Sequence, residues 1–228
     1  MMAPFKVAVY LYNGADVLDF SGPVEIYTAG PMDGPGPFTV TSFAHHTTVT
    51  ASSPSLVYTP NATFQEMKAK IQDFDVLVIP GAQPKTISEL IQTEDGKALC
   101  ALLRKFVATK PRAESGKRIL QSVCTGALLL AASNILAGRD VTTHHITFDY
   151  LKKIADEAAG GDSKVNVKRT RWADGGHSEA GVRIITAGGV SSGIDTSLYI
   201  VGELAGKEAA DWAADLVEFE RRSKGFSE

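Results

Sequence analysis

The chain has 228 residues, a formal net charge of −3 and a hydrophobic fraction of 44%, which suits one domain with a full hydrophobic core. We expect a single domain over residues 1–228, with its core in about 5–221. The slight acidity gives no reason to expect a nucleic-acid partner, and no window is apolar enough to span a bilayer.

The N-terminus and the cysteine count indicate the compartment. The opening "MMAPFKVAVYLY" has one lysine followed by a predicted strand, without the apolar stretch and cleavage site of a signal peptide. The two cysteines lie on separate elements and make no disulfide framework. The sequence therefore predicts a cytoplasmic protein.

Apolar runs rich in β-branched residues alternate with helical patterns along the whole chain. We expect strands at 6–11, 38–43, 74–82, 118–123, 139–144 and 182–187. We expect helices starting near Pro23 and over 125–136, 147–158, 194–204 and 207–221, and a further helix over 86–105 in which Gly96 is a candidate break. A hairpin is expected within 45–60, short strands within 160–189, and a frayed tail at 221–228. This alternation is typical of a three-layer α/β sandwich whose mostly parallel sheet is covered on both faces.

Cys124 lies between a predicted strand and a predicted helix, in the stretch "QSVCTGALLL". Unpaired N–H groups at a helix N-terminus favour a thiolate, so we expect the pKa of this thiol to be lowered. The pattern S-x-C-x-G resembles a nucleophile elbow, in which Gly126 allows close packing of helix on strand. The alternative is that Cys124 is a small buried apolar residue, and this alternative fits Cys100 much better.

Asp19 is the main acidic candidate near the first strand, ahead of Asp16 and Glu25. It is flanked by Leu18 and Phe20, so burial is expected to raise its pKa and make it a usable acid or base. The alternative is that Asp19 caps the helix expected near Pro23. The sequence leaves both open.

Four separated motifs resemble the ThiJ/PfpI superfamily, whose fold is that of class I glutamine amidotransferases. They are "AVYLYNGADVLDFSGPVEIY", "FDVLVIPGA", "SVCTGALLLAASNILAGRDVTTHH" and "ITAGGVSSGIDTSLYIVGELAG", in this order. Within the superfamily, "LD-x-x-GP" and "S-V-C-T-G" are most similar to the isocyanide hydratase (isonitrile hydratase) group. The resemblance covers residues 5 to about 215 and implies a flavodoxin-like α/β fold.

The resemblance also implies site residues. Cys124 matches the nucleophile and Asp19 its acidic partner, while Thr125 stands where the peptidase-like branch has histidine. Gly81 and Ala82 match the turn whose backbone N–H faces the thiol and are expected to bind substrate or an oxyanion. Thr125 is expected to be catalytic, with its hydroxyl holding the water or stabilising developing charge. The implied reaction is hydration of an isocyanide to an N-substituted formamide through a cysteine thioimidate, with a small-molecule substrate, no cofactor and a homodimeric assembly.

Other readings of the same residues remain. A glyoxalase- or deglycase-like enzyme acting on small aldehydes would use the same thiol, and a non-catalytic ligand- or redox-sensing domain would have the same fold. We expect a structural role for His144 and loop positions for His45, His46 and His177. No cluster has metal-ligand spacing, so no metal is expected.

Overall fold

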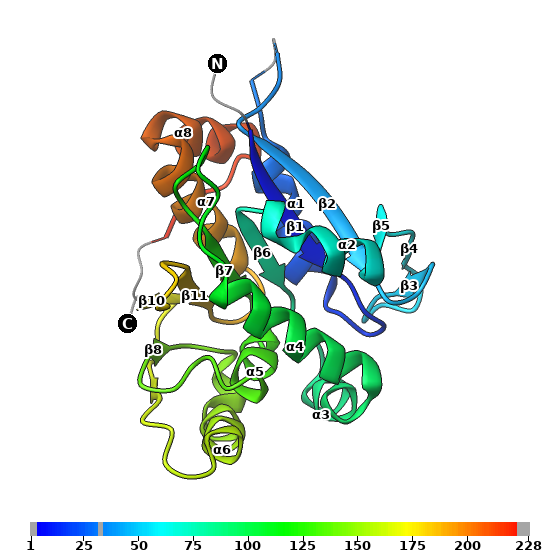
Figure 1. Ribbon diagram of the computed structural model, residues 1–228. Helices are drawn as coiled ribbons and strands as arrows, with labels where there is room; N and C mark the ends of the chain where they lie inside the picture. Colours follow the sequence, from blue (N-terminus) through cyan, green and yellow to red (C-terminus); the bar gives the residue numbers. More distant parts are fainter. Residues whose placement is uncertain (1–3, 32–33, 223–228) are drawn as a thin grey trace.

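The computed structural model describes residues 4–31 and 34–222, and most of the tail expected to fray lies outside them. Seven strands form one central sheet in the order β10-β11-β7-β6-β1-β2-β5 (Figure 1). Every neighbouring pair is parallel except β10 and β11. The strands are β1 Phe5–Tyr10, β2 Phe38–Ala44, β5 Ala62–Thr63, β6 Val76–Ile79, β7 Ile119–Ser122, β10 Trp172–His177 and β11 Arg183–Ala187.

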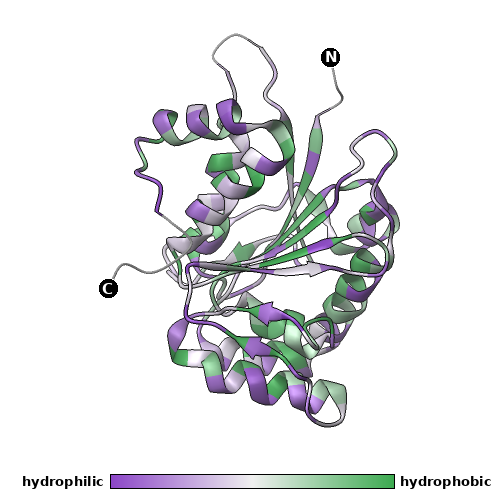
Figure 2. Cartoon of the chain, turned by 90° about the vertical axis from the view of Figure 1, so that its left-hand side faces the viewer, coloured by the Kyte–Doolittle hydropathy of each residue, from purple (hydrophilic) through white to green (hydrophobic). Residues whose placement is uncertain are grey.

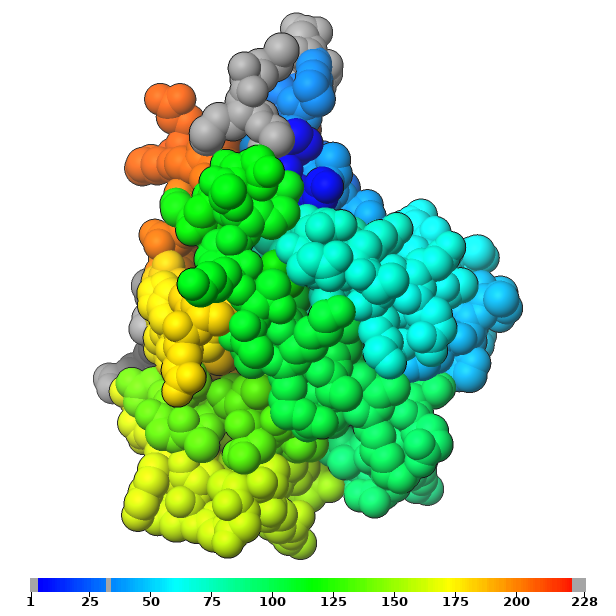
Figure 3. Space-filling model, viewed as in Figure 1, coloured from blue at the N-terminus to red at the C-terminus, as the bar shows by residue number. Residues whose placement is uncertain are grey.

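Two groups of helices cover the sheet, as Figure 2 shows from the side. The first group packs together as α1 Val17–Thr28, α7 Ser192–Ala205 and α8 Lys207–Leu216. The second is α3 Pro84–Gln92, α4 Glu94–Ala108, α5 Gly126–Ala132 and α6 Phe148–Ala159, and α2 Phe64–Lys70 packs near β2 and β5. In the space-filling view, the residues of the second group and α2 cover this face of the sheet (Figure 3). The predicted three-layer α/β fold is confirmed.

Small elements complete the fold outside the main sheet. The predicted hairpin is formed by β3 Val49–Thr50 and β4 Val57–Tyr58, and a parallel pair is formed by β8 Asp140–Val141 and β9 Asn166–Val167. Two 3-10 helices, η1 Ile71–Asp73 and η2 His145–Thr147, precede β6 and α6. No helix among the residues that the structure describes has the length and apolar character needed to cross a membrane.

Several predicted boundaries are wrong. The first helix begins at Val17 and not near Pro23, because the Asp16 side chain caps it by accepting the Leu18 N–H. The helix expected over 86–105 is divided at Thr93, which caps α4, and the candidate break at Gly96 lies inside α4. The strand expected at 139–144 shrinks to the two residues of β8.

The core strands are buried on both faces, as is usual for a parallel sheet between two helical layers. Residues Val7 to Val9 of β1 and all of β6 are fully buried. Polar side chains also link the layers: Tyr27 of α1 donates to Gln121 of β7 at 2.7 Å, and Gln121 donates to Ser197 of α7 at 2.9 Å. This link holds α1 and α7 against the strand that leads to Cys124.

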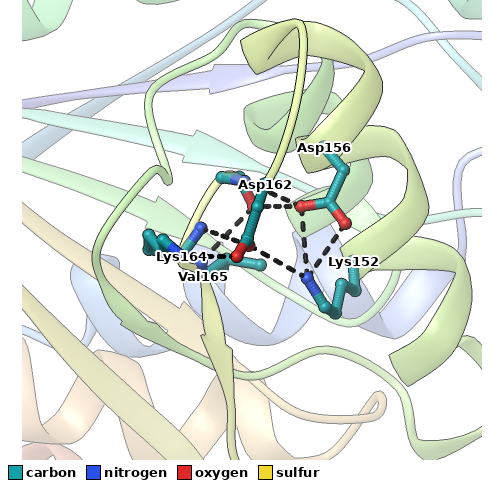
Figure 4. Close-up of polar contacts among 6 residues, drawn as sticks. Lys152, Asp156, Asp162, Lys164 and Val165 are labelled. Carbon is teal, nitrogen blue, oxygen red and sulfur yellow. Dashed lines mark hydrogen bonds and ion pairs between the residues drawn. The ribbon is translucent and has the colours of Figure 1, made fainter.

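The end of α6 is closed by a polar cluster, drawn in Figure 4. Gly160 takes the left-handed conformation at the helix end with a φ of 70°. Asp156 then accepts from the backbone and hydroxyl of Ser163 and from Lys152, and these contacts lower its pKa to about 2. The cluster fixes the chain path from α6 into β9.

Gly126, at the start of α5, generates a prediction about packing. A Cβ there would lie 2.3 Å from the Ile79 carbonyl oxygen, so we expect Gly126→Ala to lower the free energy of unfolding by about 3 kcal/mol. A Cβ at Gly161 would meet open space, so Gly161→Ala serves as the control, with little expected effect. Urea unfolding measures both, and equal stability of the two variants would contradict the packing argument.

Candidate active site

Cys124 lies in a tight turn between β7 and α5. Its φ is 56°, in the left-handed region that residues other than glycine seldom adopt. The turn is held on both sides of the residue: the Cys124 N–H donates to the Gly188 carbonyl at 2.9 Å, and the Thr143 hydroxyl donates to the Cys124 carbonyl at 3.0 Å. A tight turn with a strained backbone therefore joins β7 to α5 at Cys124.

The Cys124 side chain contributes to the wall of a pocket of about 200 Å³. The residue is only 6% exposed, so contact with solvent is confined to this opening. The other cysteine, Cys100, is buried on α4. The pocket wall around the thiol is formed by Asp16, Ala82, Thr125, His144 and Val190.

Asp19 lies in the first turn of α1 and has no exposed surface. Its Oδ2 accepts the Gly81 N–H at 2.9 Å, whereas its Oδ1 has no hydrogen-bond partner. Burial, reinforced by the charge of Asp16, raises the pKa of Asp19 to about 7, although the Gly81 N–H and the Cys124 thiol act in the opposite direction. Because Asp16 is the cap of α1, the capping alternative for Asp19 does not apply.

The thiol of Cys124 is not acidic in this environment. Burial, followed by the nearby Asp19 carboxylate, raises the pKa of Cys124 to about 12. The backbone N–H groups of Val190 and Thr125 act in the opposite direction and are outweighed. The predicted lowering of the thiol pKa is therefore wrong, because desolvation and a neighbouring carboxylate exceed the effect of a helix N-terminus.

Thr125 and the turn after β6 bind each other closely. The Ala82 N–H donates to the Thr125 hydroxyl at 2.8 Å, and the same hydroxyl donates to the Ala82 carbonyl at 2.6 Å. A side chain at Gly81 would collide with Thr125, since its Cβ would lie 2.5 Å from Oγ1. The backbone donors of Gly81 and Ala82 thus hold Asp19 and Thr125 in place, while the donors that reach the sulfur belong to Thr125 and Val190.

Val190 was not singled out from the sequence, although its segment "TAGGVSSG" follows a predicted strand. Its φ of 34° is unusual for a β-branched residue, and its N–H contacts the Cys124 sulfur. Such strain in a backbone that carries a donor is common at functional sites. The side chain type gave no signal, because the contact comes from the main chain.

His144 lies at the pocket wall. Its Nδ1 accepts the Ile146 N–H at 3.3 Å, which caps the 3-10 helix η2, and its ring stacks on His145. Burial and the neighbouring His145 lower the pKa of His144, so it is neutral at pH 7. Among the described residues, no group of three or more His, Cys, Asp or Glu side chains is arranged to hold a metal ion.

The raised pKa of Asp19 predicts a pH-dependent stability. The unfolded carboxyl ionises near pH 4 and the folded one only near pH 7, so this contribution to stability is complete at low pH and is lost as the pH rises through this window. Asp19→Asn resembles the protonated acid and avoids this loss. We expect the free energy of unfolding of Asp19→Asn, relative to the unmodified protein, to rise by up to about 4 kcal/mol between pH 4 and pH 7 in urea titrations. A constant difference would show that Asp19 ionises normally.

Comparisons with known proteins agree with the fold and the motifs. The sequence model of the DJ-1/PfpI family matches residues 5–201. Isonitrile hydratase from Pseudomonas putida is 26% identical over 206 residues, which are 90% of this chain and 74% of that protein.

Solved structures of other proteins have a similar fold. A ThiJ/PfpI family protein from Pseudomonas syringae has a TM-score of 0.70 at 23% identity, over 97% of this chain and 78% of that one. Drosophila melanogaster DJ-1beta has a TM-score of 0.71 at 20% identity, over 96% of this chain and all of that one. At these identities the structures show the fold alone, whereas the family match spans the sheet and the Cys124 turn. The chain belongs to the DJ-1/PfpI family.

Proposed function

We propose that this protein is an isonitrile hydratase, which converts an isocyanide and water to an N-substituted formamide. The observation that carries the proposal is the placement of a buried carboxyl, Asp19, beside a thiol, Cys124, that opens on a small pocket. The relative in Pseudomonas putida supports the same choice of reaction. Cys124 is the nucleophile and Asp19 the proton donor and acceptor.

The first half of the reaction adds the thiol across the terminal carbon of R–N≡C. The sulfur of Cys124 forms a bond to that carbon, and the proton held between sulfur and Asp19 moves to the same carbon. The product is the thioimidate R–N=CH–S–Cys, with no change in oxidation level. The N–H groups of Thr125 and Val190 favour the anionic sulfur before attack.

The second half releases the product. Asp19, now ionised, accepts a proton from water as the water oxygen bonds to the thioimidate carbon, and Asp19 passes this proton on to the nitrogen. The tetrahedral R–NH–CH(OH)–S–Cys then loses its C–S bond, and the hydroxyl proton returns to the Asp19 and Cys124 pair. The formamide R–NH–CHO leaves, and the pair again holds one proton.

Thr125 has a positioning role in this mechanism. Its hydroxyl is fully engaged with the backbone of Ala82, so it fixes the turn whose Gly81 N–H orients Asp19. The backbone donors of Gly81 and Ala82 serve the same purpose. The charge of the reacting sulfur is met instead by the main chain at Thr125 and Val190.

Substitution of the proposed catalytic residues tests the mechanism directly, with the second cysteine as the control. Cys124→Ala removes the nucleophile, so we expect formamide production from an alkyl isocyanide, followed by NMR, to fall by more than ~1000-fold. Asp19→Asn keeps the shape but removes the proton carrier, with an expected loss of about 100-fold. Cys100→Ala is the matched control and should keep its activity, because Cys100 lies on α4 away from the pocket wall. Activity that survives in Cys124→Ala, or lactate formation from methylglyoxal without isocyanide turnover, would overturn the proposal.

The pH dependence of turnover follows from the number of protons that Asp19 and Cys124 hold together. The active pair of Asp19 and Cys124 holds one proton, whereas below pH 7 both groups are protonated. We therefore expect kcat/KM to rise with pH through an apparent pKa near 7 that belongs to the pair. Rates at fixed ionic strength between pH 5 and 9 provide the measurement, and a profile that falls over this range would contradict the assignment.

A further inference from the structure

We propose that Asp16 makes the Cys124 pocket selective by charge, so that it takes neutral or cationic small molecules and excludes anionic ones. The part of this inference that names isocyanides rests on the proposed function. The part that concerns access to the thiol depends only on the structure. The proposed reaction uses Asp19 and Cys124, and it assigns no role to Asp16.

Asp16 is fixed at the pocket wall by contacts of its own. Its N–H donates to the Gly81 carbonyl at 2.8 Å, and its Oδ1 accepts the Leu18 N–H at 3.1 Å as the cap of α1. The residue is only partly exposed, and it lines the same pocket as Cys124. A carboxylate held in this way presents its negative charge at a constant position.

No opposite charge faces Asp16 within the pocket. Its wall contains no lysine or arginine among the described residues, and His144 is neutral at pH 7. Lys85 follows the wall residue Pro84 along the chain, but its side chain is exposed and pairs with Glu89 at 3.7 Å. The negative charge of Asp16 is therefore not neutralised by the wall, and a partly enclosed site strengthens its effect on a bound ion.

The influence of Asp16 extends to the reacting groups. Its charge raises the pKa of both Asp19 and Cys124. An anionic substituent on a substrate would meet this carboxylate and, once Asp19 ionises, a second one. A neutral or cationic substituent meets no such repulsion, so the wall favours isocyanides without acidic groups.

The chain offers matched variants for a test. Asp16→Asn and Asp16→Ser remove the charge and keep a good helix cap, so α1 should form in both. Glu25→Gln is the control, because it removes one negative charge from an exposed position on the same helix, outside the pocket wall. Circular dichroism confirms folding before the chemistry is measured.

The first measurement uses thiol reagents and needs no turnover. Methanethiosulfonates form a disulfide with the Cys124 thiolate and release methanesulfinate, and they are available with a cationic aminoethyl or an anionic sulfonatoethyl group. Peptide mass spectrometry at Cys124 gives both rates, and their ratio cancels changes in thiolate fraction. We expect Asp16→Asn and Asp16→Ser to raise the anionic-to-cationic rate ratio by about tenfold at low salt, with less effect at high salt. An unchanged ratio, or an equal change in Glu25→Gln, would overturn the proposal.

The second measurement uses substrates. Isocyanoacetate is anionic, and its methyl ester is a neutral analogue of similar size. We expect the unmodified protein to prefer the ester in kcat/KM, and Asp16→Asn to reduce that preference by about tenfold. If Asp16→Asn changes the anionic-to-cationic rate ratio of the thiol reagents but neither isocyanide is hydrated, the charge selectivity stands and the proposed hydratase activity fails. If the isocyanides are hydrated with no response to Asp16→Asn in either measurement, the charge selectivity fails alone.

Discussion

A carboxyl group without access to water is the constraint around which this site is built. Asp19 accepts the Gly81 N–H, its Oδ1 has no hydrogen-bond partner, and the Cys124 thiol lies near enough to affect its pKa. Ionising a buried carboxyl group with few hydrogen-bond donors costs free energy, because burial removes the water that would solvate the charge. The structure therefore keeps a proton in the site at neutral pH, and the chemistry of Cys124 depends on where that proton lies.

Asp19 and Cys124 are held in place by loops that hydrogen-bond to one another, and not by a single helix or strand. The Tyr12 hydroxyl donates to the Pro80 carbonyl at 2.9 Å, the Asp16 N–H donates to Gly81, and Thr125 binds Ala82 in both directions. These contacts join the ends of β1, β6 and β7, which are neighbours in the sheet. Because parallel strands bring their carboxyl ends to one edge, residues far apart in the sequence meet there.

The sequence predicts the parts of this arrangement that depend on local pattern. Apolar runs mark β1, β6, β7 and β11, and the small residue Gly126 directly after a strand and cysteine marks the tight turn. The start of α1 was missed because Pro23 is a strong start signal, whereas here it lies inside a helix that Asp16 caps.

Properties that depend on residues distant in the sequence could not be predicted from local sequence patterns. The pKa of Cys124 depends on burial and on Asp19, which lies 105 positions earlier, so the helix N-terminus alone gave the wrong direction. The donor at Val190 is a main-chain group that every residue except proline carries, and nothing in the side chain marks it. Pattern identifies which residues are chemically able to act, but only the packing determines the charge that they carry.

The raised thiol pKa does not argue against a nucleophilic Cys124, because the two groups titrate together. Burial is the larger cause of the raised thiol pKa, and the Asp19 carboxylate is the next; the second contribution disappears when Asp19 holds the proton. In that state the N–H groups of Thr125 and Val190 face an anionic sulfur, and the charge of Asp19 no longer opposes them. In the proposed mechanism, a single proton moving from the sulfur to Asp19 thus creates the nucleophile and the acid in one step.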